Sequence, residues 1–484
     1  MANKSAVSAS QSPAGSFGNV DLLNSNTNYA DVFSSDVRTR LWSELVTRDA
    51  REQNVFAKFI GSEGSGAPVV EKRDLSAGGS DKVTFTTVAP IRGQGVRGEA
   101  ILKNNTGKLK FGTFNVEVDL IRHAVAWTQV IKLMRFTGKT IDQLSAEVMA
   151  EWAGRTEQDH IQMVLRDTCL DNGNNLISGY GTGAAGALNY ADGLSTDIIQ
   201  EAKQALIAQG GEPMNVGGDD KTEIPGYLFF APDAVLRPLR SDPDYLEAIL
   251  SADERSGSNK LYSGNYAMWD GNMIANHNVI LDTADGRQGS PLLPTAITTE
   301  EVTPKEGATE VINLGAGLDT FANFTGFDAK IPGGGGGKYS VSTGGYVLLV
   351  APNGNHAVYQ YAENNGDELK NLTHIDIAQS GSESPDETAF ASGTMIYQCN
   401  ILGTPIGYAL AMGKSALYYA KGAVSNEQIF HYDDFSNSGN EAHLSAVGIQ
   451  SVYGMAVYQD TKGRIPGVQL IEAVRQIPGF SFTA

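Results

Sequence analysis

Cysteine is scarce in this chain. Cys169 and Cys399 are the two among 484 residues, and they stand far apart. Two distant cysteines give neither a disulfide framework nor the closely spaced ligands of a zinc site, and they are typical of a protein from a reducing compartment. With 41% hydrophobic residues, the chain has enough apolar material for a large core, and its length predicts two or three domains.

Long apolar runs are also absent. No run approaches the roughly 20 residues that a helix needs to span a bilayer. The opening stretch MANKSAVSASQSPAGSFGN lacks the apolar h-region of a secretory signal. We therefore expect a soluble protein that is made in a cytoplasm and has no membrane contact.

Positive charge is in short supply. Lys and Arg number 36 against 55 Asp and Glu, which gives a net charge of -19 and a pI of about 4.8. A protein that grips nucleic-acid phosphates is expected to carry a basic face and a high pI. The composition therefore argues against tight nucleic-acid binding, and the excess negative charge keeps free subunits apart.

Catalytic motifs are missing: the chain contains no G-x-S-x-G, H-E-x-x-H or C-x-x-C. The stretch PGGGGGKYS resembles a phosphate-binding loop, but Pro332 stands where that loop needs Gly and Tyr339 where it needs Ser or Thr. We interpret His123 as structural, the HYDD stretch at 431–434 as a solvated turn, and Asp219–Asp220 as a loop tip. We expect no catalytic residue, metal site or cofactor; the alternative is an acidic soluble hydrolase with two converging carboxylates.

Alternation of apolar and polar residues predicts two strands. Val83 and Phe85 alternate with polar neighbours, and residues 114–120 alternate strictly. Between them, residues 89–113 are rich in Gly, Lys and Arg, whereas a hairpin turn needs only about 2–5 residues. The sequence therefore predicts two strands that hold out a long arm.

The apolar phase slips inside this arm. Leu109 and Phe111 are at odd positions, whereas Phe114 and Val116 are at even ones. One extra residue at Gly112 would produce such a slip, so we interpret it as a β-bulge that twists the arm.

The longest predicted helix follows the arm. The stretch TIDQ is a capping box with Thr140 as N-cap, and helical spacing of apolar residues continues until Gly173 ends it. Residues 141–171 would span roughly 45 Å as a helix. Gly154 lies in the middle, at a cost of about 1 kcal/mol relative to Ala, and we interpret it as the point where the helix bends.

The other segments predict an interleaved α+β protein. Residues 1–30 lack periodicity, and an amphipathic helix is expected in SSDVRTRLWSELVTRDARE. A further helix is predicted over 197–209, and a short one in DAVLRPLRSD, interrupted by Pro238. Strands are predicted at YLFFAP, MIANHNVIL, GYVLLVAP, IGYALAMG, ALYYAKGA, SVYGMAVY and GVQLIEAV. Residues 285–342, which include PGGGGGK, are interpreted as an insertion.

Charge is divided unequally between the arm and the long helix. The arm carries five basic residues against Glu99, or +4: Arg92, Arg97, Lys103, Lys108 and Lys110. The helix carries seven acids against two arginines, or -5, and the acids include Asp142, Glu147, Glu151 and Glu157. We interpret these residues as an inter-subunit contact in which the arm of one copy docks onto the helix of the next; such a contact propagates into rings or shells. Two solvated charged faces are the alternative.

Five stretches over about residues 40–170 stand in a specific order and spacing: FAKFIG, DKVTF, GQGVRGEAIL, NVEVDLIRHAV and TIDQLSAEVMAEWAGRTEQDHI. The pattern resumes in YLFFAPDAVLRPLRSD, in ALYYAKGAVSNEQIFHYDDF and in SVYGMAVY. Together these stretches resemble the major capsid proteins of N-four-like tailed bacteriophages.

The resemblance implies a Hong Kong 97-type capsid fold with an N-terminal arm, an extended β-hairpin loop, a long spine helix, and peripheral and axial domains. The chain then divides into an N-terminal arm with a short helix (1–60), the extended loop and flanking strands (61–125), the spine helix and peripheral domain (126–190), the axial domain (191–284), the insertion (285–342), and the return strands of the axial and peripheral domains (343–484). The basic arm corresponds to the extended loop.

The resemblance also implies a function and partners. The chain would self-assemble, as hexamers and pentamers, into the icosahedral head shell that encloses double-stranded phage DNA without sequence-specific binding. Scaffolding, portal and decoration proteins would be its partners in the cytoplasm of a bacterial host, and the virion its final location. An encapsulin-like compartment is the alternative among shell proteins.

Overall fold

The structure is a computed structural model, and it describes residues 55–73, 82–89, 110–128, 141–177, 188, 192–217, 224–247, 266–277, 289–298, 312–313, 345–351, 356–361, 363–364, 368–375, 390, 394–421, 428–432, 444–460 and 463–477. The predicted N-terminal arm and its amphipathic helix, the tip of the basic arm and the N-cap Thr140 lie outside these residues. No helix in the described part is long and apolar enough to cross a membrane.

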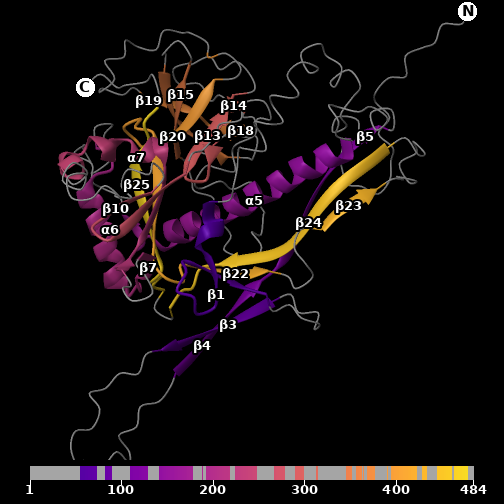
Figure 1. The fold of residues 1–484 in the computed structure, drawn as a ribbon. Coiled ribbons are helices and arrows are strands. Elements are labelled where there is room, and N and C mark those ends of the chain that lie inside the picture. The colour runs from indigo at the N-terminus through magenta and orange to yellow at the C-terminus, as the bar shows by residue number, and fades with distance from the viewer. Residues whose placement is uncertain are drawn as a thin grey trace, which may run out of the picture. The chain divides into compact units, whose positions relative to one another are not determined.

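The chain divides into two compact units, which are described one at a time. The first unit takes in residues 1–57, 119–158 and 421–453, and the second takes in 58–118, 159–420 and 454–484. Helix α5 (Ile141–Asn172) contributes to both units, and its 32 residues confirm the long helix predicted from the sequence (Figure 1).

In the first unit, three strands form an antiparallel ladder. β24 (Leu444–Ala456) lies between β23 (Gln428–Tyr432) and β5 (Asp119–Thr128). The imidazole of His123 in β5 lies against the indole of Trp152 in α5, with the ring centroids 4.8 Å apart and the ring planes tilted by 37°. His123 is otherwise exposed, and its structural role stays a prediction.

The core of the second unit is a six-stranded sheet in the order β10-β11-β9-β21-β25-β6. Its strands are β10 (Tyr266–Trp269), β11 (Asn272–His277), β9 (Leu228–Pro232), β21 (Ile406–Met412), β25 (Val468–Val474) and β6 (Leu176–Ile177). Neighbouring residues of a strand point to opposite faces. Helix α6 (Thr196–Gln209) covers the face that carries Ala409 and Ile471, and the last turns of α5 cover the other face, where Cys169 contacts Leu470.

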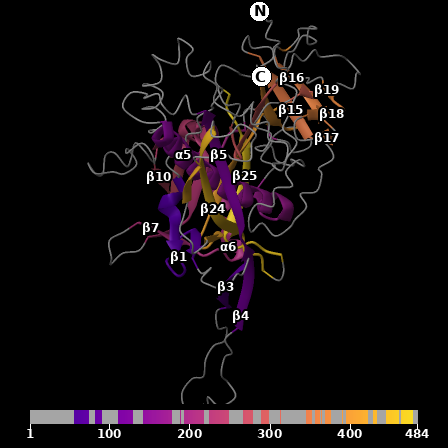
Figure 2. The ribbon, with the colours of Figure 1, turned by 90° about the vertical axis from the view of Figure 1, so that its right-hand side faces the viewer.

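A second six-stranded sheet in the same unit has the order β12-β13-β20-β15-β16-β19 (Figure 2). Its strands are β12 (Gly289–Ser290), β13 (Leu293–Ile297), β20 (Met395–Cys399), β15 (Gly345–Val350), β16 (His356–Tyr361) and β19 (Thr373–Ile375). β14 (Ile312–Asn313), β18 (Glu368–Lys370) and β17 (Glu363–Asn364) form a small sheet. Strands β12, β13 and β14 all come from residues 285–342, so this block pairs with strands outside it; its origin as an insertion stays a prediction.

Most predictions of helices and strands are confirmed. The solvated turn predicted for the HYDD stretch is wrong in its first half, because His431 and Tyr432 are the last residues of β23 and pair with β24. Helix α6 matches the helix predicted over 197–209 and ends at Gly210, whose φ of 87° is left-handed. The short helix is divided at Pro238 into α7 (Asp233–Leu236) and η3 (Pro238–Ser241). All seven predicted strand segments contain strands: β9, β11, β15, β21, β22, β24 and β25. The hairpin of β7 (Met214–Gly217) and β8 (Ile224–Gly226) was not predicted.

Candidate assembly surface: the β3–β4 hairpin and helix α5

The hairpin that carries the basic arm consists of β3 (Lys82–Ala89) and β4 (Lys110–Glu117), paired antiparallel. Side chains on one face of the hairpin pack on a layer of three parallel strands: β1 (Ile60–Ser62), β2 (Val69–Lys72) and β22 (Leu417–Lys421). The short helix η1 (Val55–Phe59) leads directly into β1. The buried side chains at this contact are Val70, Val83, Phe85, Val116 and Ala420. The apolar alternation seen in the sequence therefore holds the root of the hairpin on its own subunit.

An aromatic cluster reinforces the root. The rings of Phe85 and Phe114 stack with centroids 5.5 Å apart, and Phe114 meets Tyr418 edge-on at 4.7 Å and Tyr458 at 5.4 Å. The ammonium group of Lys72 lies 5.7 Å from the centroid of the Phe85 ring. Each aromatic pair adds about 0.5–1.5 kcal/mol beyond the burial of its surface. The cluster therefore fixes the direction in which the hairpin leaves the sheet.

The predicted β-bulge at Gly112 is wrong. Every pair from Lys82 opposite Glu117 to Ala89 opposite Lys110 keeps one register, with no extra residue on either strand. A close contact with the opposite strand, rather than a bulge, explains why glycine is present at position 112. A Cβ at Gly112 would lie 2.7 Å from Oγ1 of Thr87, the residue opposite, so a side chain at this position would collide with the Thr87 hydroxyl.

The predicted single strand over 114–120 is also wrong. β4 ends at Glu117 and pairs with β3, whereas β5 begins at Asp119 and pairs with β24. Leu120 is 45% exposed, so the buried alternation stops at the break. At the break, a Cβ on Gly454 would lie 1.9 Å from the carbonyl oxygen of Glu117, so the crossing strand approaches closely and requires glycine there.

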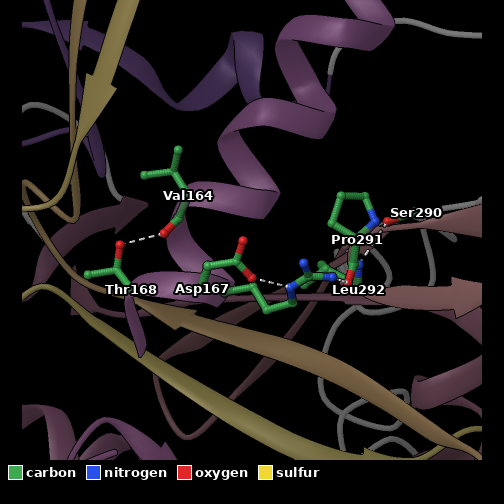
Figure 3. A network of polar contacts seen from close by, with 7 residues as sticks. Val164, Asp167, Thr168, Ser290, Pro291 and Leu292 are labelled. Atoms are coloured by element: carbon green, nitrogen blue, oxygen red, sulfur yellow. Dashed lines mark hydrogen bonds and ion pairs between the residues drawn. The ribbon is translucent and has the colours of Figure 1, made fainter. Parts of the chain in front are cut away.

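The C-terminal part of α5 is held by a buried polar network (Figure 3). Arg166 is 2% exposed; its guanidinium donates to Oδ1 of Asp167 at 2.7 Å and to the carbonyl oxygen of Pro291 at 2.6 Å. One turn earlier, the side-chain oxygen of Gln162 accepts a hydrogen bond from Ser290 Oγ. A buried charge is tolerated when it is paired and hydrogen-bonded. The network therefore fixes α5 against the β12–β13 turn.

A second buried arginine, directly after β25 of the central sheet, holds the start of β13 next to the same turn. Arg475 donates to the carbonyl oxygen of Pro294 and to Thr295 Oγ1, and its guanidinium carbon lies 4.6 Å from the centroid of the Tyr397 ring. Burial lowers the pKa of Arg475 to about 10, and the group still carries its charge at neutral pH. Residues 290–295 are thus bound by arginines from two different elements.

The face of the central sheet under α5 carries acidic groups as well. Tyr408 and Glu472 are opposite each other on β21 and β25. Burial raises the pKa of the Glu472 carboxyl above its ordinary range, and burial followed by the negative charge of Glu472 raises the pKa of the Tyr408 hydroxyl. The layer between α5 and this sheet is therefore polar as well as apolar.

The structure places some of the predicted contact residues. Arg92, Arg97, Lys103 and Lys108 lie outside the described residues, and Lys110 is the first residue of β4, opposite Ala89. The backbone of α5 carries Asp142, Glu147 and Glu151 in its first turns, and Glu157 is half-buried. Arg166 and Asp167 neutralise each other inside the protein; the remaining charges of the helix are six acids against Arg155, again -5.

Gly154 has open space around it. No heavy atom of the described structure lies within 4 Å of a Cβ built at this position, leaving out the helix's own nearby backbone. Packing therefore does not require glycine here, and its role as a helix bend stays a prediction.

Sequence reasoning missed the buried polar residues Gln162, Arg166 and Arg475. Arginine is mostly exposed in proteins, so Arg166 was counted as a surface charge of the helix. The available signal was its spacing: Gln162 and Arg166 are four residues apart, beside the buried Ile161 and Leu165. Among the described residues, no group of three or more His, Cys, Asp or Glu side chains is placed to hold a metal ion.

Comparison with known proteins identifies related sequences and folds. A family model described as "Phage capsid protein" matches residues 33–292, more than half of the chain. Among solved structures, the chain is similar to the capsid of Ralstonia phage GP4, with a TM-score of 0.52 and 14% identity over 89% of this chain and 93% of that one. It is also similar to the cyanophage Pam1 capsid asymmetric unit, with a TM-score of 0.50 and 14% identity over 98% and 99%. No curated protein matches. The likeness shows a phage capsid fold of mixed α+β content, mostly strands.

Proposed function

Since the chain belongs to the phage capsid protein family and is a major capsid protein of a phage head shell, we propose that the basic arm of one subunit lies over the acidic first half of α5 in the next. The observation that carries this proposal is the hairpin. Its root is fixed to its own subunit by the aromatic cluster, and its strands lead into the segment 92–110, whose charge is +4. The first part of the helix, residues 141–157, offers four acids against Arg155, a complementary charge of -3.

We further propose that the shell is of the Hong Kong 97 type. In that fold the hairpin is the extended loop and α5 is the spine helix, and the subunits gather into hexamers and pentamers of an icosahedral shell around double-stranded DNA. The order of hairpin, 32-residue helix and interleaved strands supports this proposal. Scaffolding, portal and decoration proteins are the proposed partners, and the cytoplasm of a bacterial host is the proposed place of assembly.

The charges of the arm and the helix suit a reversible contact. An exposed ion pair is worth about 0–1 kcal/mol, so a few pairs cannot hold two subunits of net charge -19 together by themselves. In a closed shell each subunit makes several such contacts at once, and their sum is strong while each remains weak. Misplaced subunits can therefore leave before the shell closes.

Charge reversal in the arm tests the docking. A variant with Arg97→Glu, Lys103→Glu and Lys108→Glu should fold as a monomer but form no shells, because the arm would then repel the helix. Sedimentation and negative-stain microscopy measure the outcome, and thermal unfolding shows that the monomer is folded. The charge-conserving variant with Arg97→Lys, Lys103→Arg and Lys108→Arg is the matched control and should assemble.

A complementary change sharpens this test. Adding Asp142→Lys, Glu147→Lys and Glu151→Lys to the arm-reversed variant should restore shells, since the two partners then attract again. Normal shells from the arm-reversed variant alone would contradict the proposal.

A further inference from the structure

The β3–β4 hairpin carries large apolar side chains on two opposite faces. In β4, the even positions point toward the subunit's own body, where Phe114 is half-buried and Val116 is fully buried. The odd positions point away from it, because the register is unbroken and side chains alternate. Phe111 is at an odd position and is 65% exposed, more than any other large apolar side chain in the described residues.

The inner face loses its apolar contact at one pair of residues. Beyond Phe85 and Phe114, the next inward pair is Thr87 opposite Gly112, which offers one hydroxyl and no side chain. The Thr87 hydroxyl donates to the carbonyl oxygen of Gly112 at 3.3 Å. Packing of the hairpin on its own subunit therefore ends here, and Phe111 lies just beyond this point.

The outer face is polar until it reaches Phe111. Lys82 and Glu117 form an ion pair at 2.7 Å, and the Thr84 hydroxyl donates to Asn115 at 2.8 Å. Thr113 follows and is exposed. A polar, solvated face that ends in one exposed aromatic ring is unlike a core-facing strand. It matches an aromatic anchor at the centre of a protein contact, where such residues supply much of the affinity.

We infer that Phe111 is an apolar anchor which a second copy of this chain covers when the arm docks; the inference rests on the proposed docking of arm onto helix. Charge complementarity identifies a second copy of this chain as the partner that covers Phe111. The arm that begins beside Phe111 carries +4, which leaves -23 on the rest of the chain, so the body of another copy attracts it. In a shell built from this chain, further copies are also its neighbours.

The anchor adds what the charges lack. Attraction between exposed charges is screened at a Debye length of about 8 Å at physiological salt, whereas burial of an aromatic ring is not. The arm then has two separable components: basic residues that steer it, and a ring that holds it once seated. Removing the ring should leave steering intact and speed release.

Substitution at position 111 tests the anchor. Phe111→Ser should raise the subunit concentration at which light scattering reports assembly about tenfold or more. It should leave the thermal unfolding of the free subunit unchanged, because the ring is exposed there. Phe111→Tyr keeps the ring and should assemble at the wild-type threshold, and Thr113→Ala, on the same face, is the matched control. Assembly of Phe111→Ser at the wild-type threshold overturns the inference.

Two labels identify the occupant. The native Cys169 and Cys399 are buried, so a maleimide should react with the Phe111→Cys variant at the new thiol, quickly in free subunits and at least tenfold more slowly in shells. Equal rates in both states overturn the inference. A photoreactive benzoylphenylalanine at position 111 should yield a covalent dimer of this chain from illuminated shells; crosslinks to DNA or to a different virion protein alone also overturn it.

The outcomes separate the two proposals. If the arm-reversed variant fails to assemble while Phe111→Ser assembles normally, charge docking stands and the anchor does not. If both assemble normally, docking of the arm fails and takes the anchor with it.

Discussion

At the scale of single residues, Asp242 shows how a distant side chain begins a helix. Ser195, the N-cap of α6, makes no capping hydrogen bond with its side chain. Instead, Oδ2 of Asp242 accepts from the backbone N–H of Thr196 at 2.8 Å and from its hydroxyl at 3.0 Å. Burial raises the pKa of the Asp242 carboxyl, but the hydrogen bonds from Thr196 and from the backbone of Asp244 and Tyr245 outweigh it, so the pKa lies below its ordinary 3.8.

Loss of this cap should be measurable and pH-dependent. Asp242→Asn should lower the free energy of unfolding at pH 7 by about 1 kcal/mol. Because the folded pKa is lowered, the stabilisation is complete above the unfolded value of 3.8 and is lost as the pH falls through the folded pKa. Chemical unfolding of wild type and variant at pH 7 and at pH 3 or below should show the difference shrinking in acid.

The neighbouring aspartate supplies the control for this measurement. Asp244→Asn changes the same charge two residues away and keeps the cap on Thr196, so it should have little effect on stability. A stability difference between wild type and Asp242→Asn that stays constant down to the lowest pH would contradict the capping role.

At the scale of elements, helix α5 contains a glycine that its packing does not require. A methyl group at Gly154 meets open space, so Gly154→Ala should stabilise the helix by about 1 kcal/mol. A shell of the proposed Hong Kong 97 type matures by expanding from a rounded precursor. If Gly154 lets the helix bend in that precursor, the same change should slow the expansion. Expansion is followed by light scattering or microscopy of purified precursor particles.

The adjacent position provides a matched variant for this prediction. Ala153→Gly should lower helix stability by a similar amount while leaving Gly154 in place. Stabilised subunits whose shells expand at the wild-type rate would contradict the bend and leave Gly154 a simple weak point of the helix.

The hairpin shows what the sequence can and cannot decide. Alternation predicted both strands, since a strand with one buried face imposes a period of two. The slip at Gly112 was ambiguous, because an extra residue and an exchange of apolar faces give the same pattern on one strand. The apolar pattern of the partner strand distinguishes the two explanations. Val83 and Phe85 are at odd positions and Val88 is at an even one, so the apolar side chains of both strands change face at the same place. A bulge would shift one strand only.

Buried polar contacts lie beyond such reasoning for another reason. Arg166 lies between the buried Leu165 and the acidic Asp167, and its carbonyl partner, Pro291, is 125 residues away in the sequence. Periodicity reports which face of an element is apolar, but it does not report what a distant turn brings to that face. Only the tertiary structure shows that Arg166 and Arg475 both donate hydrogen bonds to the short segment 290–295.

At the scale of the whole molecule, net charge opposes the association that function requires. Subunits of charge -19 repel one another over a distance that salt shortens, from about 30 Å at 0.01 M to 10 Å at 0.1 M. The arm–helix pairs act at contact, where screening is weaker. We therefore expect the assembly threshold of the wild-type chain to fall as salt rises from low to physiological concentration.

Light scattering over a series of sodium chloride concentrations measures this threshold. The Phe111→Ser variant should follow the same downward trend from a higher starting value, because its loss is not electrostatic. A threshold that rises with salt would mean that the attraction between arm and helix outweighs the repulsion between whole subunits.

The unbroken register of the hairpin has a consequence for how such arms vary in length between lineages. One added residue in either strand would turn every side chain beyond it to the opposite face, and Phe111 would change sides relative to the aromatic root. Two added residues in each strand would preserve both faces and lengthen the reach by roughly 7 Å. Viable insertions and deletions in this part of the gene should therefore come in multiples of two codons per strand, so that arm length evolves in steps.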